Sequence, residues 1–358
     1  MKLLFTTSLL LGLSLHAQLM TDIQIIGSHN SYHAGLAPSE MAYLKKVNVK
    51  LAESLDYSHP PILEQLQLGV RKFEFDIFSD TKGGLFADPA APKLAAKEGL
   101  PADPPYDSTG KMRKPGFKVI HVQDLDYRSS CQPFTECLTI LRDWSKAHPR
   151  HLPVYVLIET KTGNPRPAFM VTPEPVTAET LDLLDREIQS VFELKHLITP
   201  DVVRGSSATL EAAVLSRGWP MLEAARGKIV FLFDQESVTP LYATGRPSLE
   251  GRMIFTNAKP GSPDAAFVKM NDALSPQISE LVKKGYLVRT MSDGGAVAIR
   301  ANDTKRRDAA LSSGAQIVST DYYFSKKADS GYSVEFTQGI ARCNPVRTNS
   351  CSATSIVE

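Results

Sequence analysis

The feature of this sequence that most restricts its fold is a repeated alternation of short apolar runs with helical patterns. The apolar runs cover residues 23–26, 72–77, 118–121, 154–158, 229–233, 253–255, 287–290 and 317–320. Runs of this length and composition are typical of parallel strands that are buried on both faces. Between them, helices are predicted over residues 137–147, 177–194, 276–284 and 303–313. Eight strands that alternate with helices predict an α/β fold of the (β/α)8 TIM-barrel type.

A doubly wound open sheet is the alternative for such an alternation, but no Gly-x-Gly-x-x-Gly turn follows any of the runs. No internal repeat or linker divides the chain, so residues 18–358 are predicted to form a single domain. Two long proline-containing segments, 79–117 and 162–175, follow the second and fourth predicted strands. Barrel enzymes build their active sites from loops at this end of the strands, so we expect both segments to border a site.

The N-terminus and the charge balance indicate where the protein acts and what it does not bind. Residues 1–17 combine Lys2 with an apolar run that ends at Ala17, which is typical of a secretory signal peptide cleaved near Ala17. The run is shorter than the ~20 residues of a membrane-spanning helix, so we predict a secreted or periplasmic protein. With 40 Lys and Arg against 39 Asp and Glu, the chain lacks the basic footprint of a nucleic-acid-binding protein. We expect a monomer without a nucleic-acid partner.

The four cysteines fall into two pairs of near neighbours, Cys131 with Cys137 and Cys343 with Cys351. An even number of cysteines in a secreted chain favours disulfides, and these spacings favour two local ones. A zinc site would require Cys-x-x-Cys spacing and nearby histidines, and neither pair has them. We therefore predict two disulfides that each close a short loop.

Polar side chains gather where four of the predicted strands end. They are His29 and Asn30 after the first strand, Glu74 and Asp76 in the second, His121 in the third, and Glu159 and Lys161 at the end of the fourth. The carboxyl ends of parallel barrel strands meet at one mouth, so we expect these side chains to converge. Carboxylate and amide oxygens are the ligands that calcium and magnesium prefer. Two histidines beside such a metal would suit acid–base chemistry.

A structural salt bridge is the local alternative for the second strand. Lys72 shares a face with Glu74 and Asp76, because side chains alternate along a strand, and it can neutralise carboxylates that would otherwise repel each other. The repetition of the pattern at Glu159 and Lys161 favours a functional site over an isolated ion pair. The remaining histidines are interpreted as structural: His16, His33, His59, His148, His151 and His196.

These residues resemble the motifs of one enzyme family. The segments are Gly27-Ser28-His29-Asn30-Ser31-Tyr32-His33, residues 68–76, Val119-Ile120-His121 and Leu157-Ile158-Glu159. Their order and spacing resemble the catalytic barrel of the phosphoinositide-specific phospholipases C. Residues 159–161, 314–323 and 342–345 support a likeness to the secreted, calcium-dependent bacterial branch in particular. The resemblance spans nearly the whole chain after the signal peptide.

The resemblance implies a ligand set and a reaction. Asn30, Glu74, Asp76 and Glu159 would bind one Ca²⁺ ion, in preference to Mg²⁺, and His29 and His121 would form the catalytic pair. The metal would lower the pKa of the inositol hydroxyl beside the phosphodiester, and this hydroxyl would attack phosphorus. The products would be diacylglycerol and a cyclic inositol phosphate. His29 is assigned as base or phosphate contact and His121 as acid, and a metal-bound carboxylate is the other candidate base.

Two cations are candidates for contacts with the phosphate or the headgroup of the lipid, Lys161 and Arg128. Metal-independent relatives carry an arginine just after the second strand, whereas here Asp76 is followed by Ile77-Phe78-Ser79. On the sequence alone, only Lys72 neutralises the carboxylates, which favours a bound metal.

Two other functions stay open at this point. A glycerophosphodiester phosphodiesterase or a sphingomyelinase D-like lyase also uses two histidines and a Glu/Asp cation site, but the former typically has His-Arg-Gly where this chain has His29-Asn30. A secreted barrel that binds a lipid headgroup or a glycan without turnover would be expected to lack some of the converging residues, and all are present. No amphipathic anchor is evident, so we expect transient docking on a membrane surface through the proline-containing segments.

Overall fold

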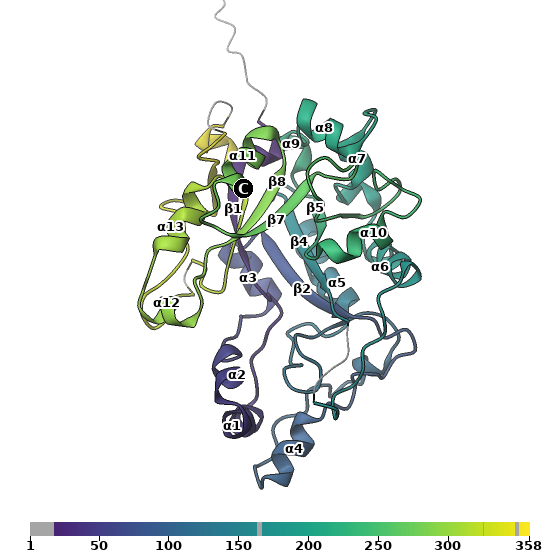
Figure 1. Ribbon diagram of the computed structural model, residues 1–358, viewed down its shortest axis with the longest axis vertical. Helices are drawn as coiled ribbons and strands as arrows, with labels where there is room; N and C mark the ends of the chain where they lie inside the picture. Colours follow the sequence, from purple (N-terminus) through teal and green to yellow (C-terminus); the bar gives the residue numbers. More distant parts are fainter. Residues whose placement is uncertain (1–17, 163–166, 325, 348–350) are drawn as a thin grey trace, which may run out of the picture.

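A computed structural model describes residues 18–162, 167–324, 326–347 and 351–358. Its centre is a barrel of parallel strands in the order β6-β5-β4-β2-β1-β9-β8-β7 (Figure 1). The strands are β1 (Ile23–Ser28), β2 (Lys72–Phe78), β4 (Val154–Thr160), β5 (Ile229–Phe233), β6 (Ile254–Phe255), β7 (Phe267–Asp272), β8 (Leu287–Met291) and β9 (Ile317–Thr320). A parallel bridge between Asn257 and Phe267 joins the β6 and β7 edges and nearly closes the barrel. The predicted TIM-barrel fold is confirmed.

One of the eight predicted barrel strands is wrong, and one barrel strand was missed. Residues 118–121 were expected as the third barrel strand, but β3 (Lys118–Val119) runs antiparallel against the end of β2, with Val119 opposite Ile77. β4 pairs directly with β2 instead. The missed strand is β7, in which Lys269, Asn271 and Asp272 interrupt the apolar run. Such a strand does not give the continuous apolar signal on which the prediction relied.

Helices cover the outside of the barrel, and all four predicted helices are present within a few residues of their expected ends. The covering helices are α3 (Ile62–Leu68), α5 (Phe134–Ala147), α6 (Ala178–Val191), α7 (Pro200–Arg204), α8 (Leu210–Ser216), α9 (Leu222–Ala225), α10 (Thr239–Tyr242), α11 (Gln277–Lys284) and α13 (Lys305–Ser312). In α5, Leu138, Leu141 and Trp144 recur at helical spacing and are buried. Short helices in the βα loops are α1 (Pro38–Val47), α2 (Val49–Ser54), α4 (Ala91–Lys97) and α12 (Ala296–Arg300). Figure 1 shows α1, α2 and α4 projecting beyond one end of the barrel.

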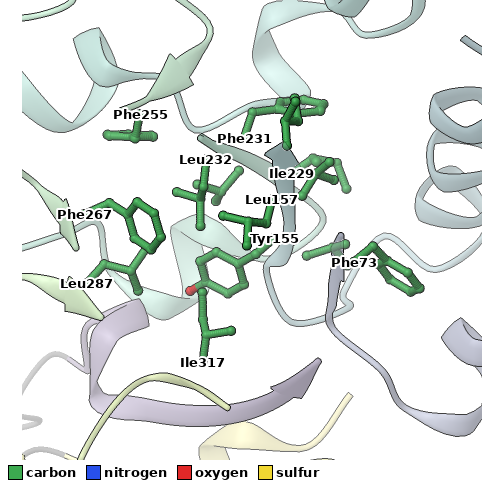
Figure 2. Packing of buried hydrophobic residues seen from close by; sticks show 14 of the residues in the cluster. Phe73, Tyr155, Leu157, Ile229, Phe231, Leu232, Phe255, Phe267, Leu287 and Ile317 are labelled. Carbon is green, nitrogen blue, oxygen red and sulfur yellow. The ribbon is translucent and has the colours of Figure 1, made fainter. Parts of the chain in front are cut away.

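The two faces of β2 show how the core positions the site. Phe75 points outward, and its ring centroid lies 6.2 Å from that of Phe134 on α5. Residues of the opposite face, among them Lys72, therefore point into the barrel. Deeper in the molecule, Tyr155, Leu232, Leu287 and Ile317 pack together with other buried residues, as Figure 2 shows. Charged inward residues thus lie above an apolar floor.

Both proline-containing segments fold over the end of β2. Phe86 and Met112 of the first segment and Met170 of the second pack with Phe78 and Tyr127 in a hydrophobic cluster of their own. The segments are therefore packed elements of the barrel mouth and not free flaps.

Both predicted disulfides are confirmed: Cys131 is bonded to Cys137 and Cys343 to Cys351. β10 (Ala341–Cys343), which carries one of these cysteines, runs antiparallel to β1. No helix among the described residues is long and apolar enough to span a membrane. The predicted signal peptide, residues 1–17, lies outside the described residues.

Candidate active site

Three of the predicted metal ligands are carboxylates that lie together at the mouth of the barrel. Glu74 and Asp76 are inward-facing residues of β2, and Glu159 is the register partner of Asp76 on β4. One carboxylate oxygen of each residue lies within 4.8 Å of those of the other two. The fourth predicted ligand, Asn30, follows β1 with φ 43° and is buried. Its turn is tied to β2, because the amide N–H of Ser31 donates to the carbonyl of Glu74 at 3.1 Å.

Lys161 lies between two of these carboxylates. Its Nζ is 2.8 Å from Oδ2 of Asp76 and 3.0 Å from Oε1 of Glu159. Burial nevertheless raises the pKa of both carboxyl groups above their ordinary values, and repulsion by Glu74 at Asp76 and by Asp76 at Glu159 contributes. Oδ1 of Asp76 is buried, and no described residue makes a well-formed hydrogen bond to it, although the buried hydroxyl of Tyr32 lies near this carboxyl group. An unpartnered buried oxygen in a group of carboxylates fits a hard divalent cation such as Ca²⁺.

Glu74 is neutralised by two cations, one of which the sequence did not indicate. Lys72 donates to Oε2 of Glu74, and Nη2 of Arg289, which comes from β8, donates to the same oxygen at 3.0 Å. Burial opposes ionisation here, but these two charges outweigh it and hold the pKa of Glu74 well below its usual range. The expectation that only Lys72 neutralises the carboxylates is therefore wrong, because Arg289 and Lys161 serve them as well. The case for a metal now depends on the unpartnered oxygen of Asp76 and not on a deficit of positive charge.

His29 lies on the Glu74 side of the cluster and is held by an aspartate. Its Nδ1 is 3.2 Å from Oδ1 of Asp321, which follows β9, and its Nε2 is 3.8 Å from Oε1 of Glu74. Partial burial disfavours the imidazolium, but the two carboxylates outweigh it and raise the pKa of His29 above its ordinary value. Oδ1 of Asp321 also lies 3.3 Å from Nε2 of the buried His59. The backbone N–H of Asp321 donates to Asp293 at 2.7 Å, which fixes this turn.

His121 lies on the Asp76 side of the cluster and is held in the same way. Its Nδ1 is 2.6 Å from Oδ2 of Asp126, and Nε2 of the buried His33 is 2.7 Å from the same oxygen. Burial alone would raise the pKa of Asp126, but the hydrogen bonds from His121 and His33 lower it below its ordinary value. The backbone N–H of Ile120 donates to the carbonyl of Asp76 at 3.1 Å, which sets His121 beside the end of β2.

The structure does not bring the second predicted headgroup contact into this cluster. Nε and Nη2 of Arg128 donate to Glu40 of α1 at 2.8 and 2.9 Å, and Nη2 also donates to the carbonyl of Pro104 at 3.0 Å. Arg128 thereby connects α1 to the first proline-containing segment. Lys161, by contrast, contacts the carboxylate cluster directly.

The sequence analysis did not identify Asp321 and Asp126. Each of these aspartates also contacts a second histidine, His59 and His33 respectively, and both histidines were interpreted as structural. Asp321 stands within residues 314–323, and Asp126 stands five residues after His121. A search for carboxylates near each predicted catalytic histidine would have found both as candidates. The contacts with His59 and His33 are set by loop conformation, and no spacing in the sequence indicates them.

The arrangement combines an acid–base pair with a cation site. Each of His29 and His121 contacts an aspartate through Nδ1, which leaves Nε2 available to a reacting group. The two histidines interact with different carboxylates of β2, His29 with Glu74 and His121 with Asp76. Such a site can hold a charged phosphodiester and move one proton on each side of it.

Comparison with known proteins shows the family to which the chain is similar. Residues 19–345 match the family model described as phosphoinositide phospholipase C, Ca²⁺-dependent. A solved structure of a calcium-dependent phosphoinositol-specific phospholipase C from Pseudomonas sp. is similar with a TM-score of 0.54 at 15% identity, covering 93% of this chain and 97% of the other. A Ca²⁺-dependent phosphatidylinositol-specific phospholipase C from Streptomyces antibioticus is similar with a TM-score of 0.52 at 18% identity, covering 85% of this chain and 95% of the other. A search of curated protein sequences finds no match.

The structural likeness supports the barrel fold, and the family match extends over most of the chain. The matched residues include the carboxylate cluster and all four histidines that contact it or its flanking aspartates. The chain therefore belongs to the family of Ca²⁺-dependent phosphoinositide phospholipases C, which are phosphodiesterases.

Proposed function

We propose that this enzyme cleaves phosphatidylinositol-type lipids in a calcium-dependent reaction that yields diacylglycerol and a cyclic inositol phosphate. The observation that carries the proposal is that His29 interacts with Glu74 and His121 with Asp76, two carboxylates that form one cluster with Glu159. The pairing of each histidine with its own aspartate supports two separate proton transfers.

The metal site would be formed by Asn30, Glu74, Asp76 and Glu159. When bound there, a single Ca²⁺ ion would supply positive charge to the phosphate and would lower the pKa of the inositol hydroxyl beside the phosphodiester. Asp76 is the central ligand in this proposal, because its Oδ1 is buried without a hydrogen-bond partner among the described residues.

Two histidines carry out the proton transfers of the proposed reaction, His29 as the base and His121 as the acid. A cation bound at Glu74 would weaken the attraction that favours the His29 imidazolium. In the neutral ring, Nε2 of His29 takes the proton of the inositol hydroxyl, and Asp321 stabilises the positive charge that then forms on the imidazole. The hydroxyl oxygen bonds to phosphorus, and the bond from phosphorus to the glycerol oxygen breaks. Nε2 of His121 gives its proton to that glycerol oxygen, while Asp126 holds Nδ1. Lys161 contacts the phosphate from the side of Asp76 and Glu159.

The substrate is proposed to be reached by transient docking on a membrane surface. The proline-containing segments at the mouth support this, because the second of them carries the exposed side chain of Phe169, which is 43% accessible to solvent. Secretion after cleavage near Ala17 and a monomeric state remain part of the proposal.

The experiment follows the phosphorus-containing products by ³¹P spectra, with Ca²⁺ and with a chelator, for phosphatidylinositol vesicles beside glycerophosphocholine and sphingomyelin. We expect calcium-dependent release from phosphatidylinositol alone, and a cyclic phosphate product in ³¹P spectra. His29→Ala and His121→Ala should each lower kcat by ~10²- to 10⁴-fold. His148→Ala is the matched control, since His148 is exposed and follows α5 at the opposite end of the barrel.

Two outcomes would contradict the proposal. Turnover of glycerophosphocholine or sphingomyelin in place of phosphatidylinositol would show that the enzyme acts on a different class of phosphodiester. Full activity in the presence of the chelator would show that the reaction does not require calcium.

A further inference from the structure

His33 lies in a buried cluster with the residue that holds the proposed acid. Its Nε2 is 2.8 Å from Oδ1 and 2.7 Å from Oδ2 of Asp126, and the side chains of both residues are fully buried. Oδ2 of Asp126 is also 2.6 Å from Nδ1 of His121. One carboxylate therefore joins a buried histidine to a histidine that faces the site.

The backbone around His33 fixes its ring in place. His33 forms an antiparallel bridge with Ser129, and the carbonyl of His33 accepts the N–H of His59 at 2.8 Å. The ring of Tyr57 stacks on the imidazole with a centroid distance of 4.1 Å and an interplanar angle of 20°. The Oη of Tyr57 in turn accepts the Nδ2–H of Asn30 at 2.8 Å. The imidazole is thus clamped between the loop after β1 and the loop after β3.

The hydrogen bonds define the tautomer of His33. Its Nδ1 is buried and has no hydrogen-bond partner among the described residues. A proton on this nitrogen would be a buried donor without an acceptor, which is costly. His33 is therefore the Nε2–H tautomer and donates to Asp126. Asp126 accepts one hydrogen bond from Nε2–H of His33 and a second from Nδ1–H of His121. Because Nδ1 of His121 faces Asp126, Nε2 of His121 points away from the aspartate.

An apolar residue would fill this fully buried position without leaving a ring nitrogen unpartnered. What His33 adds over such a residue is one hydrogen bond to Asp126. The hydrogen bond to Asp126 is therefore the contribution of His33 that an apolar residue could not make.

We infer that His33 is a positioning residue of the phosphodiesterase: it fixes the carboxylate of Asp126, and through it the orientation and tautomer of His121. The inference rests on the proposed function, in which Nε2 of His121 protonates the leaving oxygen. His33 itself does not touch the substrate. A small rotation of the acid costs a large factor in rate, because proton transfer depends on a near-attack geometry.

The first test compares His33→Leu, which removes the donor, with His33→Gln, whose amide N–H lies near the position of Nε2. We expect His33→Leu to lower kcat on phosphatidylinositol by roughly 10- to 100-fold with KM changed by less than about 2-fold. His33→Gln should recover most of the loss. In an Asp126→Asn background, His33→Leu should have little further effect, since the two residues act as one unit.

The control for a purely structural role is His151→Leu. His151 is equally buried but lies before β4, at the other end of the barrel. The substitution His151→Leu should lower the melting temperature without a selective loss of kcat. A loss in His33→Leu that appears in KM, that Gln does not rescue, or that adds fully to Asp126→Asn would overturn the inference.

A second measurement does not depend on turnover. In the neutral form of the ring, which is the form left after the acid has given up its proton, the ¹⁵N shifts of His121 should show a single Nδ1–H tautomer in the parent enzyme and a mixture of tautomers in His33→Leu. Unchanged shifts in His33→Leu would reject the role of His33, whatever the activity. If the parent enzyme does not cleave phosphatidylinositol but the shifts change as expected, the proposed function fails and the positioning of His121 by His33 stands.

Discussion

At the scale of single residues, Lys161 has two roles that oppose each other. It lies 2.8 Å from Asp76 and 3.0 Å from Glu159, and both carboxylates are proposed metal ligands. A cation in this place repels a divalent ion and also occupies oxygens that the ion would use. In the proposed reaction the same ammonium contacts the phosphate. Calcium affinity and turnover should therefore respond to Lys161 in opposite directions.

Lys161→Met should bind Ca²⁺ about 3- to 30-fold more tightly than the parent, because a like charge beside the metal ligands is removed. The same variant should turn over phosphatidylinositol more slowly. Titration calorimetry with Ca²⁺ in the absence of lipid measures the first effect. Lys269→Met is the matched control, because the Lys269 side chain is 22% exposed against 23% for Lys161 and is paired with Asp234. Weaker calcium binding in Lys161→Met would mean that Lys161 orients the ligands and does not compete with the ion.

At the scale of elements, the loops after β2 and β4 combine a buried interior with an exposed rim. Their packing with Phe78 and Tyr127 means that deletion of residues 85–100 would remove Phe86 and Ala91 from a hydrophobic cluster. Such a deletion would lower stability and membrane docking together, so it cannot separate them. A substitution at an exposed apolar side chain is the sharper test.

Phe169→Ser should weaken the action on phosphatidylinositol vesicles several-fold and leave the cleavage of a soluble short-chain substrate unchanged. The reason is that Phe169 is 43% exposed at the mouth, where insertion of an aromatic ring into a lipid surface adds affinity. Vesicle sedimentation and the two activities measure the effect. The control is Leu194→Ser, since Leu194 is 59% exposed and lies three residues before Leu197, which bridges Ile229 where β5 begins at the other end of the barrel. Equal losses on vesicles and soluble substrate would exclude docking through Phe169.

The elements also show what the sequence can and cannot predict about this site. Glu74, Asp76 and Glu159 could be placed together because period-two alternation and parallel register determine their positions. Arg289 could not be assigned to Glu74, because the contact joins strands 215 residues apart and depends on the curvature of the barrel. For the same reason β7 was missed: its alternating polar residues resemble a loop unless the neighbouring strands are known.

At the scale of the whole molecule, the two ends of the barrel differ in their electrostatics. The mouth contains the carboxylate cluster and its cations, whereas the base contains a histidine whose burial favours the neutral form. Nδ1 of His151 contacts the carbonyl of Leu152 at 2.5 Å, and Nε2 contacts Oγ of Ser145 at 2.7 Å. Because Nδ1 donates to a carbonyl, Nε2 accepts the hydroxyl proton of Ser145. Burial opposes a second proton on the ring, because the imidazolium would be removed from water.

His151 should therefore make the stability of the fold depend on pH. Burial lowers the pKa of His151 to about 4, from an unfolded value near ~6.5. Between these pH values the unfolded chain binds more protons than the folded one. The contribution of His151 to the free energy of unfolding is therefore complete above pH ~6.5 and is lost as the pH falls from ~6.5 towards 4. The loss amounts to about 3 kcal/mol at most. Because other groups titrate in this window, the quantity to measure is the difference between the parent and His151→Gln in urea unfolding at several pH values. The difference should shrink as pH falls, and a constant difference from pH 7 to pH 4 would show that His151 is not the titrating group.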